Sequence, residues 1–342
     1  MTYNLFVTLF FVIFLFSINI FLKKYNVSLD KISVGEQHKS LLRSSDSIPL
    51  SGTYFFLPIV LFLFFQIDLI IVIYCSLFFI LGLLSDLKIA NSYKLRLLVQ
   101  FLFLSSLFFM SKEITISTKI AFIDNFMNYN LTRILVCSFF FMVLINGFNL
   151  IDGTNCLCSL NLLIITIFIF LLVRDLNLYF INNELYILII SLAVFLLFNF
   201  FGKNFLGDGA AYGLSFLVGY ILVKIAIMGN AISPYFVANL LWYPAFENLF
   251  SILRRNFSNT NNYLPDNDHL HQLIFKYFIT KKFTNKTFLL SSVVGIIINL
   301  VLLIFFYIGY MFYNHTLTQI VLILSGIILY LTTYFGLRYR LR

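Results

Sequence analysis

Long apolar stretches, separated by short polar segments, follow one another along almost the whole chain. A helix needs about 20 apolar residues to cross the hydrocarbon layer of a membrane, with a usable range of roughly 17–25. The sequence therefore predicts about eleven spanning helices, over residues 3–22, 52–67, 68–84, 95–111, 133–149, 158–174, 185–199, 211–228, 236–253, 287–312 and 317–337. The predicted fold class is an all-α integral membrane protein, a bundle of transmembrane helices with cytoplasmic loops.

The first apolar run, Tyr3 to Leu22, is predicted to be a retained spanning helix and not a signal peptide. A signal peptide carries a basic segment before its apolar run and a small-residue cleavage site after it. This run has neither, and its positive charges, Lys23 and Lys24, follow it.

The run from Gly52 to Leu84 is interrupted only at Gln66 and Asp68, so it can form one long helix or a hairpin of two short ones. Cytoplasmic loops are enriched in Lys and Arg, so the basic residues choose between these alternatives. With a hairpin, 18 lie inside (Lys23, Lys24, Lys31, Lys39, Arg43, Lys88, Lys94, Arg96, Lys203, Arg254, Arg255, Lys276, Lys281, Lys282, Lys286, Arg338, Arg340 and Arg342) and 4 outside (Lys112, Lys119, Arg133 and Arg174). With one long helix, 9 of these basic residues lie inside and 13 lie outside. The hairpin is favoured, with the N-terminus outside and the C-terminus in the cytoplasm.

Composition agrees with a protein embedded in a lipid bilayer. Of the 342 residues, 61% are hydrophobic and 11% are charged, and the mean hydropathy is +0.96. A soluble domain is about half apolar and a quarter charged. The 44 Phe and 20 Tyr residues suit a lipid-facing surface with aromatic interface positions. The net charge of +9 does not indicate nucleic-acid binding, because the basic residues are scattered between apolar spans.

A single domain is predicted over residues 1–342, and its one substantial soluble segment is the polar loop 254–286. Cys75 and Cys137 lie within apolar runs, where cysteine acts as a small hydrophobe. Cys156 and Cys158 form a C-x-C without a second pair, so packing is favoured over metal binding for them.

Two acidic motifs lie at the cytoplasmic ends of predicted spans. Asp86 ends the third span and is followed by Lys94 and Gln100. A carboxylate there can hold a divalent cation and a lysine can offset a phosphate, while a helix-end charge in water is the simpler alternative. Asn149 and Asp152 are spaced i, i+3 and face one way on a helical turn, with oxygens that suit Mg²⁺. An ordinary turn needs no such pair, so a functional role is favoured for them.

A third acidic motif is the Gly-Asp-Gly sequence from Gly207 to Gly209. The glycines allow the backbone to approach a ligand closely, and Asp208 between them can hold a metal ion. Lys203 supplies a cation and Phe205 a flat face for a base. Alone, a Gly-Asp-Gly sequence is equally typical of a turn.

The polar loop carries His269 and His271 after Arg254 and Arg255. Two histidines can bind zinc, but no third or fourth ligand is evident in the sequence. Phosphate binding fits these cations better, with solvated loop residues as the alternative. Because the predicted topology brings all the motifs to the cytoplasmic side, together they describe a site for a metal-bound diphosphate beside lipid.

These motifs resemble those of the polyprenyl-phosphate N-acetylhexosamine-1-phosphate transferases, also called membrane glycosyltransferase family four, over nearly the whole chain. The matching positions are Ser85-Asp86 with Lys94 and Gln100, Asn149 to Gly153, Lys203 to Asp208, and His269 with His271. His38-Lys39, Ile48-Pro49 and Gly52 resemble the first cytoplasmic loop of the family. Four motifs in this order and on one side are improbable by chance.

The resemblance implies that polyprenyl phosphate attacks the sugar-linked phosphorus of a UDP-sugar and releases UMP. Asp208, Asn149 and Asp86 would hold Mg²⁺, or Mn²⁺ in its place, and Phe205 would stack on uracil. The implied catalytic residues are Asp86, Asp152, Asp208, His269 and His271, and the implied substrate-binding residues are Lys94, Asn149, Lys203, Phe205, Arg254 and Arg255. The protein would act in the bacterial inner membrane, with a cytoplasmic active site, to start lipopolysaccharide or cell-wall glycan synthesis.

Four positions depart from the family pattern: Ser85 and Asn155 replace aspartates, Cys156 replaces a glycine, and Gln272 replaces a histidine. If the first aspartate must deprotonate the lipid phosphate, Ser85 removes that base. However, a phosphate monoester has a second pKa near 6, as phosphorylated side chains do, so much of it is already dianionic at neutral pH. Divergence in sugar specificity is therefore favoured over loss of activity.

Two other functions stay open: an inactive relative that binds lipid or nucleotide, and a transporter. Transporters place polar residues near the bilayer midplane and often contain paired broken helices. Here the predicted spans are apolar and the polar groups gather at one face, which favours an enzyme at the membrane interface. The sequence leaves open the sugar, the glycan pathway, the polyprenyl length, and whether the protein is a homodimer.

Overall fold

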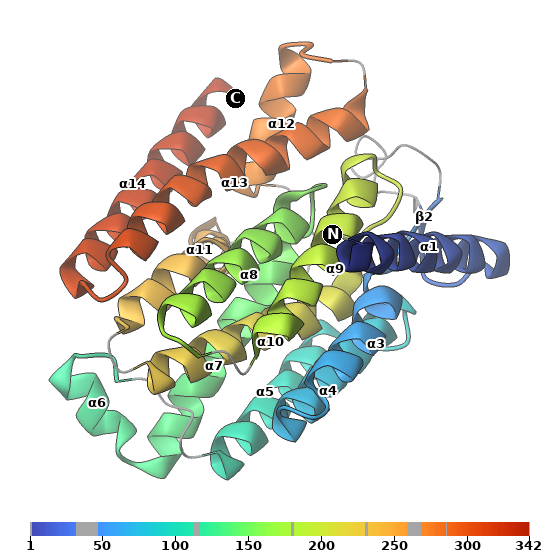
Figure 1. Cartoon of the computed structure of the whole chain (residues 1–342). Coiled ribbons are helices and arrows are strands. Elements are labelled where there is room, and N and C mark those ends of the chain that lie inside the picture. Colours follow the sequence, from blue (N-terminus) through green and yellow to red (C-terminus); the bar gives the residue numbers. More distant parts are fainter. Residues whose placement is uncertain are drawn as a thin grey trace.

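A computed structural model of the chain describes residues 2–31, 47–111, 117–178, 181–229, 232–258, 268–284 and 286–341. Its first half contains α1 (Thr2–Tyr25), β1 (Leu29–Lys31), β2 (Ser47–Pro49), α3 (Gly52–Phe64), α4 (Leu69–Asp86), α5 (Tyr93–Met110), α6 (Ala121–Met127) and α7 (Asn130–Ile151). The second half contains α8 (Leu157–Asp175), α9 (Asn182–Phe200), α10 (Gly207–Met228), α11 (Pro234–Ser258), α12 (Leu270–Thr280), α13 (Thr287–Met311) and α14 (Thr316–Arg340). Figure 1 shows these helices gathered in one bundle.

The all-α membrane fold predicted from the sequence is confirmed. Within the described ranges, nine helices are long and apolar enough to cross a membrane. Two of the eleven predicted spans fall outside this group. With 13 residues, α3 reaches about 20 Å at 1.5 Å per residue, less than the hydrocarbon layer. The longer α11 is less apolar, because polar residues such as Asn239, Glu247 and Asn248 interrupt it, and all three are buried within the protein.

The apolar run from Gly52 to Leu84 is divided into two helices, as the hairpin prediction required. Asp68 explains the break, because its side chain accepts the backbone N–H groups of Ile70 and Ile71 at 3.0 and 3.2 Å and so caps the start of α4. The same carboxylate forms an ion pair of 2.5 Å with Lys224 of α10. The side of the membrane on which each loop lies stays a prediction.

A buried helix, α10, packs against α3, α4, α7 and α8 in the interior of the bundle (Figure 1). Glycines bring α10 and α4 into backbone contact: a Cβ on Gly82 would lie 2.4 Å from the Cα of Gly209. Because real Cβ atoms do not approach so closely, only glycine permits this contact. It brings the end of α4 beside the start of α10, where Asp86 and Asp208 lie.

A small antiparallel sheet of β1 and β2 was not predicted from the sequence. It precedes α3, and a further bridge joins Leu50 to Phe205, whose N–H donates to the carbonyl of Pro49 at 3.0 Å. Ile48 and Pro49 of the expected first cytoplasmic loop therefore lie in β2, while His38 and Lys39 are outside the described residues. The polar loop 254–286 contains the end of α11 and the whole of α12.

Candidate active site

One pocket of about 280 Å³ is lined by side chains from separate parts of the chain. The end of α4 contributes Asp86, the turn after α7 contributes Asp152, and the start of α10 contributes Asp208. Phe205 comes from the segment before α10, and Lys88 adds a basic residue to the wall. Carboxylates that belong to three separate sequence motifs thus border a single cavity.

Asp86 holds the start of α10. One carboxylate oxygen accepts the backbone N–H of Asp208 at 2.9 Å, and the other accepts that of Gly209 at 3.2 Å. The first N–H groups of a helix have no partner within it, so a carboxylate there satisfies them and interacts favourably with the helix dipole. Gly207 has a φ of +80°, and a Cβ on it would lie 2.8 Å from Asp86 Oδ2. Glycine is required at this position for both reasons.

Asp208 forms an ion pair and a hydrogen bond through one carboxylate oxygen. The Ser85 hydroxyl donates to Asp208 Oδ2 at 2.6 Å, and Arg96 reaches the same oxygen at 3.1 Å. Arg96 also donates to Ser85 Oγ. Ser85, one of the departures from the family pattern, thus orients the Asp208 carboxylate together with Arg96.

Arg96 is a site residue that the sequence reasoning missed. The sequence analysis names Lys94 instead, which is exposed, whereas Arg96 is half-buried and contacts Asp208. Arg96 and Gln100 are spaced i, i+4 on α5 and therefore share a face. Gln100 is buried and its side-chain oxygen accepts from Asn146 at 2.7 Å. Only the structure shows that this face of α5 turns inward, so the sequence carried no signal that favours Arg96 over Lys94.

Asp152 follows the last residue of α7 and accepts the backbone N–H of Gly207 at 3.1 Å. Burial raises the pKa of the Asp152 carboxyl well above its usual range, and the nearby charges of Asp208 and Asp86 raise it further. Like charges thus crowd one side of the pocket.

The pocket suits a hard divalent cation bound partly by substrate. Among the described residues, no three His, Cys, Asp or Glu side chains approach closely enough to form a closed metal cage. Mg²⁺ often uses only one or two protein carboxylates, and completes its coordination with water and substrate phosphates. Asp86 and Asp208 supply such oxygens, and a cation would relieve the repulsion among the carboxylates. These residues therefore fit the ion.

Asn149, the third predicted metal ligand, lies on the last turn of α7. Its backbone carbonyl accepts the N–H of Asp152 at 3.3 Å. The side chain is half-buried and is not part of the pocket lining. Asn149 and Asp152, which are spaced i, i+3, therefore close the last turn of α7. The metal role of Asn149 stays a prediction.

The segment before α10 brings Phe205 to the pocket and leaves Lys203 outside it. Lys203 is exposed, with its ammonium 6.0 Å from the centre of the Phe201 ring. Buried Asn199 holds this segment, because its amide nitrogen donates to the carbonyl of Asn204 at 2.8 Å. The Asn199 side-chain oxygen accepts the N–H of Cys156 at 2.7 Å, which ties the segment to the turn after α7.

Asn155 and the two cysteines pack inside the protein. The backbone N–H of Asn155 donates to the Ser291 hydroxyl at 3.0 Å, and its side chain donates to the carbonyl of Phe288 at 3.4 Å. Cys156 and Cys158 are both buried. Asn155 thus fastens the turn after α7 to α13.

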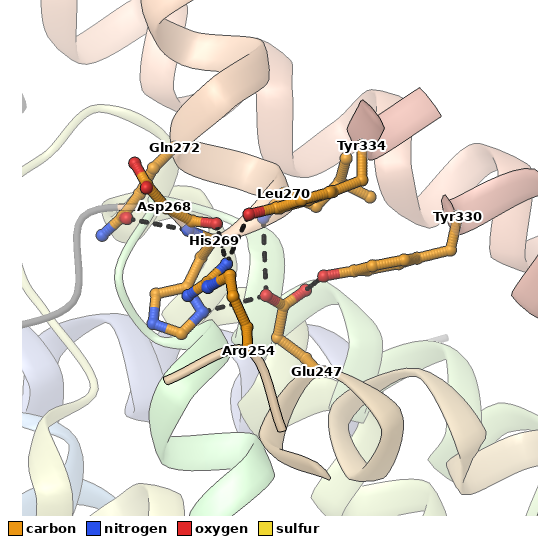
Figure 2. Close-up of polar contacts among 8 residues, drawn as sticks. All are labelled: Glu247, Arg254, Asp268, His269, Leu270, Gln272, Tyr330 and Tyr334. Atoms are coloured by element: carbon orange, nitrogen blue, oxygen red, sulfur yellow. Dashed lines mark hydrogen bonds and ion pairs between the residues drawn. The ribbon is translucent and has the colours of Figure 1, made fainter. Parts of the chain in front are cut away.

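His269 and His271 are buried beside the pocket and are not part of its lining. His269 Nδ1 lies 2.9 Å from Glu247 Oε1, and Figure 2 marks this contact with a dashed line. Arg254 donates to the hydroxyl of Tyr334 at 2.8 Å, and Arg255 is half-buried near the end of α11. The substrate-contacting roles implied for these four residues stay predictions. Glu247 was not identified from the sequence, because only the tertiary structure pairs it with His269.

Residues 69–226 match the model of glycosyl transferase family 4, a family that includes polyprenyl-phosphate hexosamine-1-phosphate transferases. No curated protein matches the chain. The matched segment contains Asp86, Asp152 and Asp208 with the helices that position them. Residues 69–226, which carry these three carboxylates, are therefore similar to glycosyl transferase family 4.

Proposed function

We propose that this protein transfers a sugar-1-phosphate from a UDP-sugar to polyprenyl phosphate and releases UMP. The observation that carries the proposal is the pocket in which Asp86, Asp152 and Asp208 lie together at the ends of membrane helices. The family match supports a polyprenyl-phosphate sugar-1-phosphate transferase kind of activity. A lipid substrate needs an enzyme in the bilayer, and a diphosphate donor needs cations, which carboxylates at the membrane surface can supply by holding a divalent metal ion.

In the proposed reaction, an oxygen of the lipid phosphate forms a bond to the phosphorus that carries the sugar. The bond from that phosphorus to the UMP oxygen breaks, and UMP leaves with the electron pair. Phosphoryl transfer of this kind depends on positioning and charge neutralisation more than on covalent chemistry by the protein. Since a phosphate monoester is largely dianionic above a pKa of about 6, Ser85 need not act as a base.

The pocket residues have separate roles in this proposal. Asp86 and Asp208 would hold Mg²⁺, or Mn²⁺ in its place, which on binding would neutralise charge on the diphosphate. Arg96 orients Asp208, and Lys88 adds a cation near the phosphates. Phe205 offers a flat face on which the uracil ring would stack.

We infer a location in the bacterial inner membrane, with the pocket on the cytoplasmic side. The excess of basic residues on the segments that surround the pocket supports this orientation. We propose an N-acetylhexosamine as the sugar, and lipopolysaccharide or the cell wall as the destination of the product.

The test is release of UMP by purified protein from a panel of UDP-sugars, with polyprenyl phosphate and Mg²⁺. Asp208→Asn should lower the rate by about 100-fold or more, as removal of a charge-stabilising group does in other active sites. The control is Asp175→Asn, an exposed carboxylate at the end of α8, which should keep the rate. Both variants should remain folded.

Other outcomes would change the proposal in defined ways. A wild-type sample that binds UDP but turns over no sugar nucleotide would indicate an inactive relative. Recovery of turnover in Ser85→Asp would then identify the missing carboxylate as the cause. An undiminished rate in excess chelator would remove the divalent cation from the mechanism.

A further inference from the structure

Glu247 is a fully buried carboxylate that the proposed chemistry does not use. It lies on α11, and one of its oxygens accepts from His269 Nδ1 at 2.9 Å and from the backbone N–H of Leu270 at 3.4 Å. The other oxygen accepts the Tyr330 hydroxyl at 2.8 Å. Burial of a carboxylate is costly unless hydrogen bonds satisfy its oxygens. These donors come from α14 and from the start of α12, so Glu247 joins three parts of the chain.

The contact with Glu247 determines the state of the His269 ring. A carboxylate can only accept hydrogen bonds, so this bond requires a proton on Nδ1 of His269. The partner of one ring nitrogen decides the tautomer and orients the other nitrogen. Glu247 therefore fixes both the rotation of the ring and the position of its proton.

The start of α12 is held by a second set of contacts around His269 (Figure 2). Arg254 donates to the carbonyl of Asp268 and to the Tyr334 hydroxyl. The side chain of Gln272, where the family pattern has a histidine, accepts the backbone N–H of His269 at 3.1 Å. The position of His269 is thus fixed from α11, α12 and α14 together.

The two histidines connect this buried cluster to the pocket. The rings of His269 and His271 are parallel, at an angle of 1°, with centroids 5.6 Å apart. A Cβ on Gly153 would lie 2.9 Å from His271 Nε2, so the ring packs directly against the Asp152–Gly153 turn. Gly153 and Asp152 both line the pocket. A displacement of His269 would therefore reach the pocket wall through His271.

We propose that Glu247 is a positioning residue for the transferase site, an inference that rests on the proposed function. Glu247 keeps the Nδ1 proton on His269 and holds the start of α12, so that the paired histidines support the Asp152–Gly153 turn. It acts through His269 and does not contact substrate.

The kinetic test uses Glu247→Gln, which keeps the size of the side chain and removes its charge. It should lower kcat for UMP release about tenfold or more and change KM for the UDP-sugar little, because a residue that positions the pocket wall without contacting substrate acts mainly on kcat. In a His269→Gln background it should have no further effect on kcat, since the two residues act as a unit. Additive losses in the double variant would overturn the proposal.

The matched control is Asn248→Leu on the same helix. Asn248 is also buried, and it donates to the carbonyl of Val143 at 3.0 Å. This variant should lose thermal stability and keep kcat, because its contact does not involve the histidines. An equal loss of kcat in Asn248→Leu would reduce Glu247 to a general structural role and overturn the proposal.

A spectroscopic test needs no substrate. The chain contains 4 histidines, so a sample with ¹⁵N-labelled histidine gives a readable NMR spectrum. The His269 signal, identified by its loss in His269→Gln, should show a protonated Nδ1 that changes in Glu247→Gln. An unprotonated Nδ1 in the wild-type protein would overturn the proposal even if the variant failed to fold. A protonated Nδ1 in a sample without transferase activity would instead leave the positioning contact intact and count against the proposed function alone.

Discussion

At the scale of single residues, the Asp208 carboxylate is shared between Ser85 and Arg96. The serine donates a neutral hydrogen bond at 2.6 Å and the arginine forms an ion pair at 3.1 Å. Four carboxylates, those of Asp30, Asp86, Asp152 and Asp208, border the pocket, and Arg96 offsets the charge of Asp208. Ser85 is therefore best interpreted as a group that orients a neighbouring carboxylate.

Two basic residues on α5 allow this interpretation to be tested. Arg96→Gln should lower kcat/KM for UMP release by about tenfold to 100-fold, because it leaves the Asp208 carboxylate without its ion pair. Lys94→Gln should lower kcat/KM less, since Lys94 is exposed, whereas Arg96 contacts Asp208 directly. A larger loss in Lys94→Gln, measured in the same assay, would contradict the role given to Arg96.

The sequence could predict Asp86, Asp152, Asp208 and Phe205 as pocket residues, because each lies in a short motif at the end of an apolar run. It could not choose Arg96 over Lys94, because that choice depends on which face of α5 turns toward α10. Nor could it pair residues of α11 and α12, which only the packing of distant helices brings together.

At the scale of elements, the contact between α4 and α10 decides where the pocket lies. A Cβ on Gly209 would lie 2.1 Å from Thr53 Oγ1 and 2.9 Å from the backbone carbonyl oxygen of Phe79. The helices could accommodate it only by separating, which would also move Asp86 away from the amides that it caps. Stability and site geometry are therefore coupled at this glycine.

Gly209→Ala should destabilise the protein by about 1–3 kcal/mol, the typical cost of overpacking a close contact. The matched control is Gly336→Ala on α14, where nothing lies within 4 Å of the added Cβ. That change should be neutral or stabilising by up to about 1 kcal/mol, because alanine is the better helix former. Thermal unfolding of both variants in one detergent measures the difference, and equal melting temperatures would contradict the packing argument.

The elements themselves were predictable to different degrees. Long apolar runs with a polar break, such as the one at Asp68, are read directly from the sequence. The pairing of β1 with β2 could not be predicted from the sequence, because strands of 3 residues carry almost no periodic signal. The sequence predicts α11 as an apolar spanning helix, but the helix carries several polar side chains. These side chains can lie in the bundle because they form hydrogen bonds inside the protein, as Asn248 and Glu247 do.

At the scale of the whole molecule, the orientation of the bundle determines which substrates reach the pocket. The basic residues predict that the segments carrying Phe205 and Asp268 both lie in the cytoplasm. Reporter fusions made after each of these residues should both report a cytoplasmic location. A periplasmic signal from either fusion would place the motifs on opposite sides and remove the basis of a shared site.

The contact of Asp86 with the amides of Asp208 and Gly209 links ligand affinity to helix stability. Any ligand that binds the Asp86 carboxylate also affects the stability of the first turn of α10, because the same oxygens accept hydrogen bonds from that turn. By linkage, a ligand that strengthens this junction stabilises the folded protein, and a change that loosens the junction weakens the ligand. Substitutions along α10 that contact no substrate can therefore alter how tightly substrate binds, and homologous enzymes can differ in affinity without differing in any pocket residue.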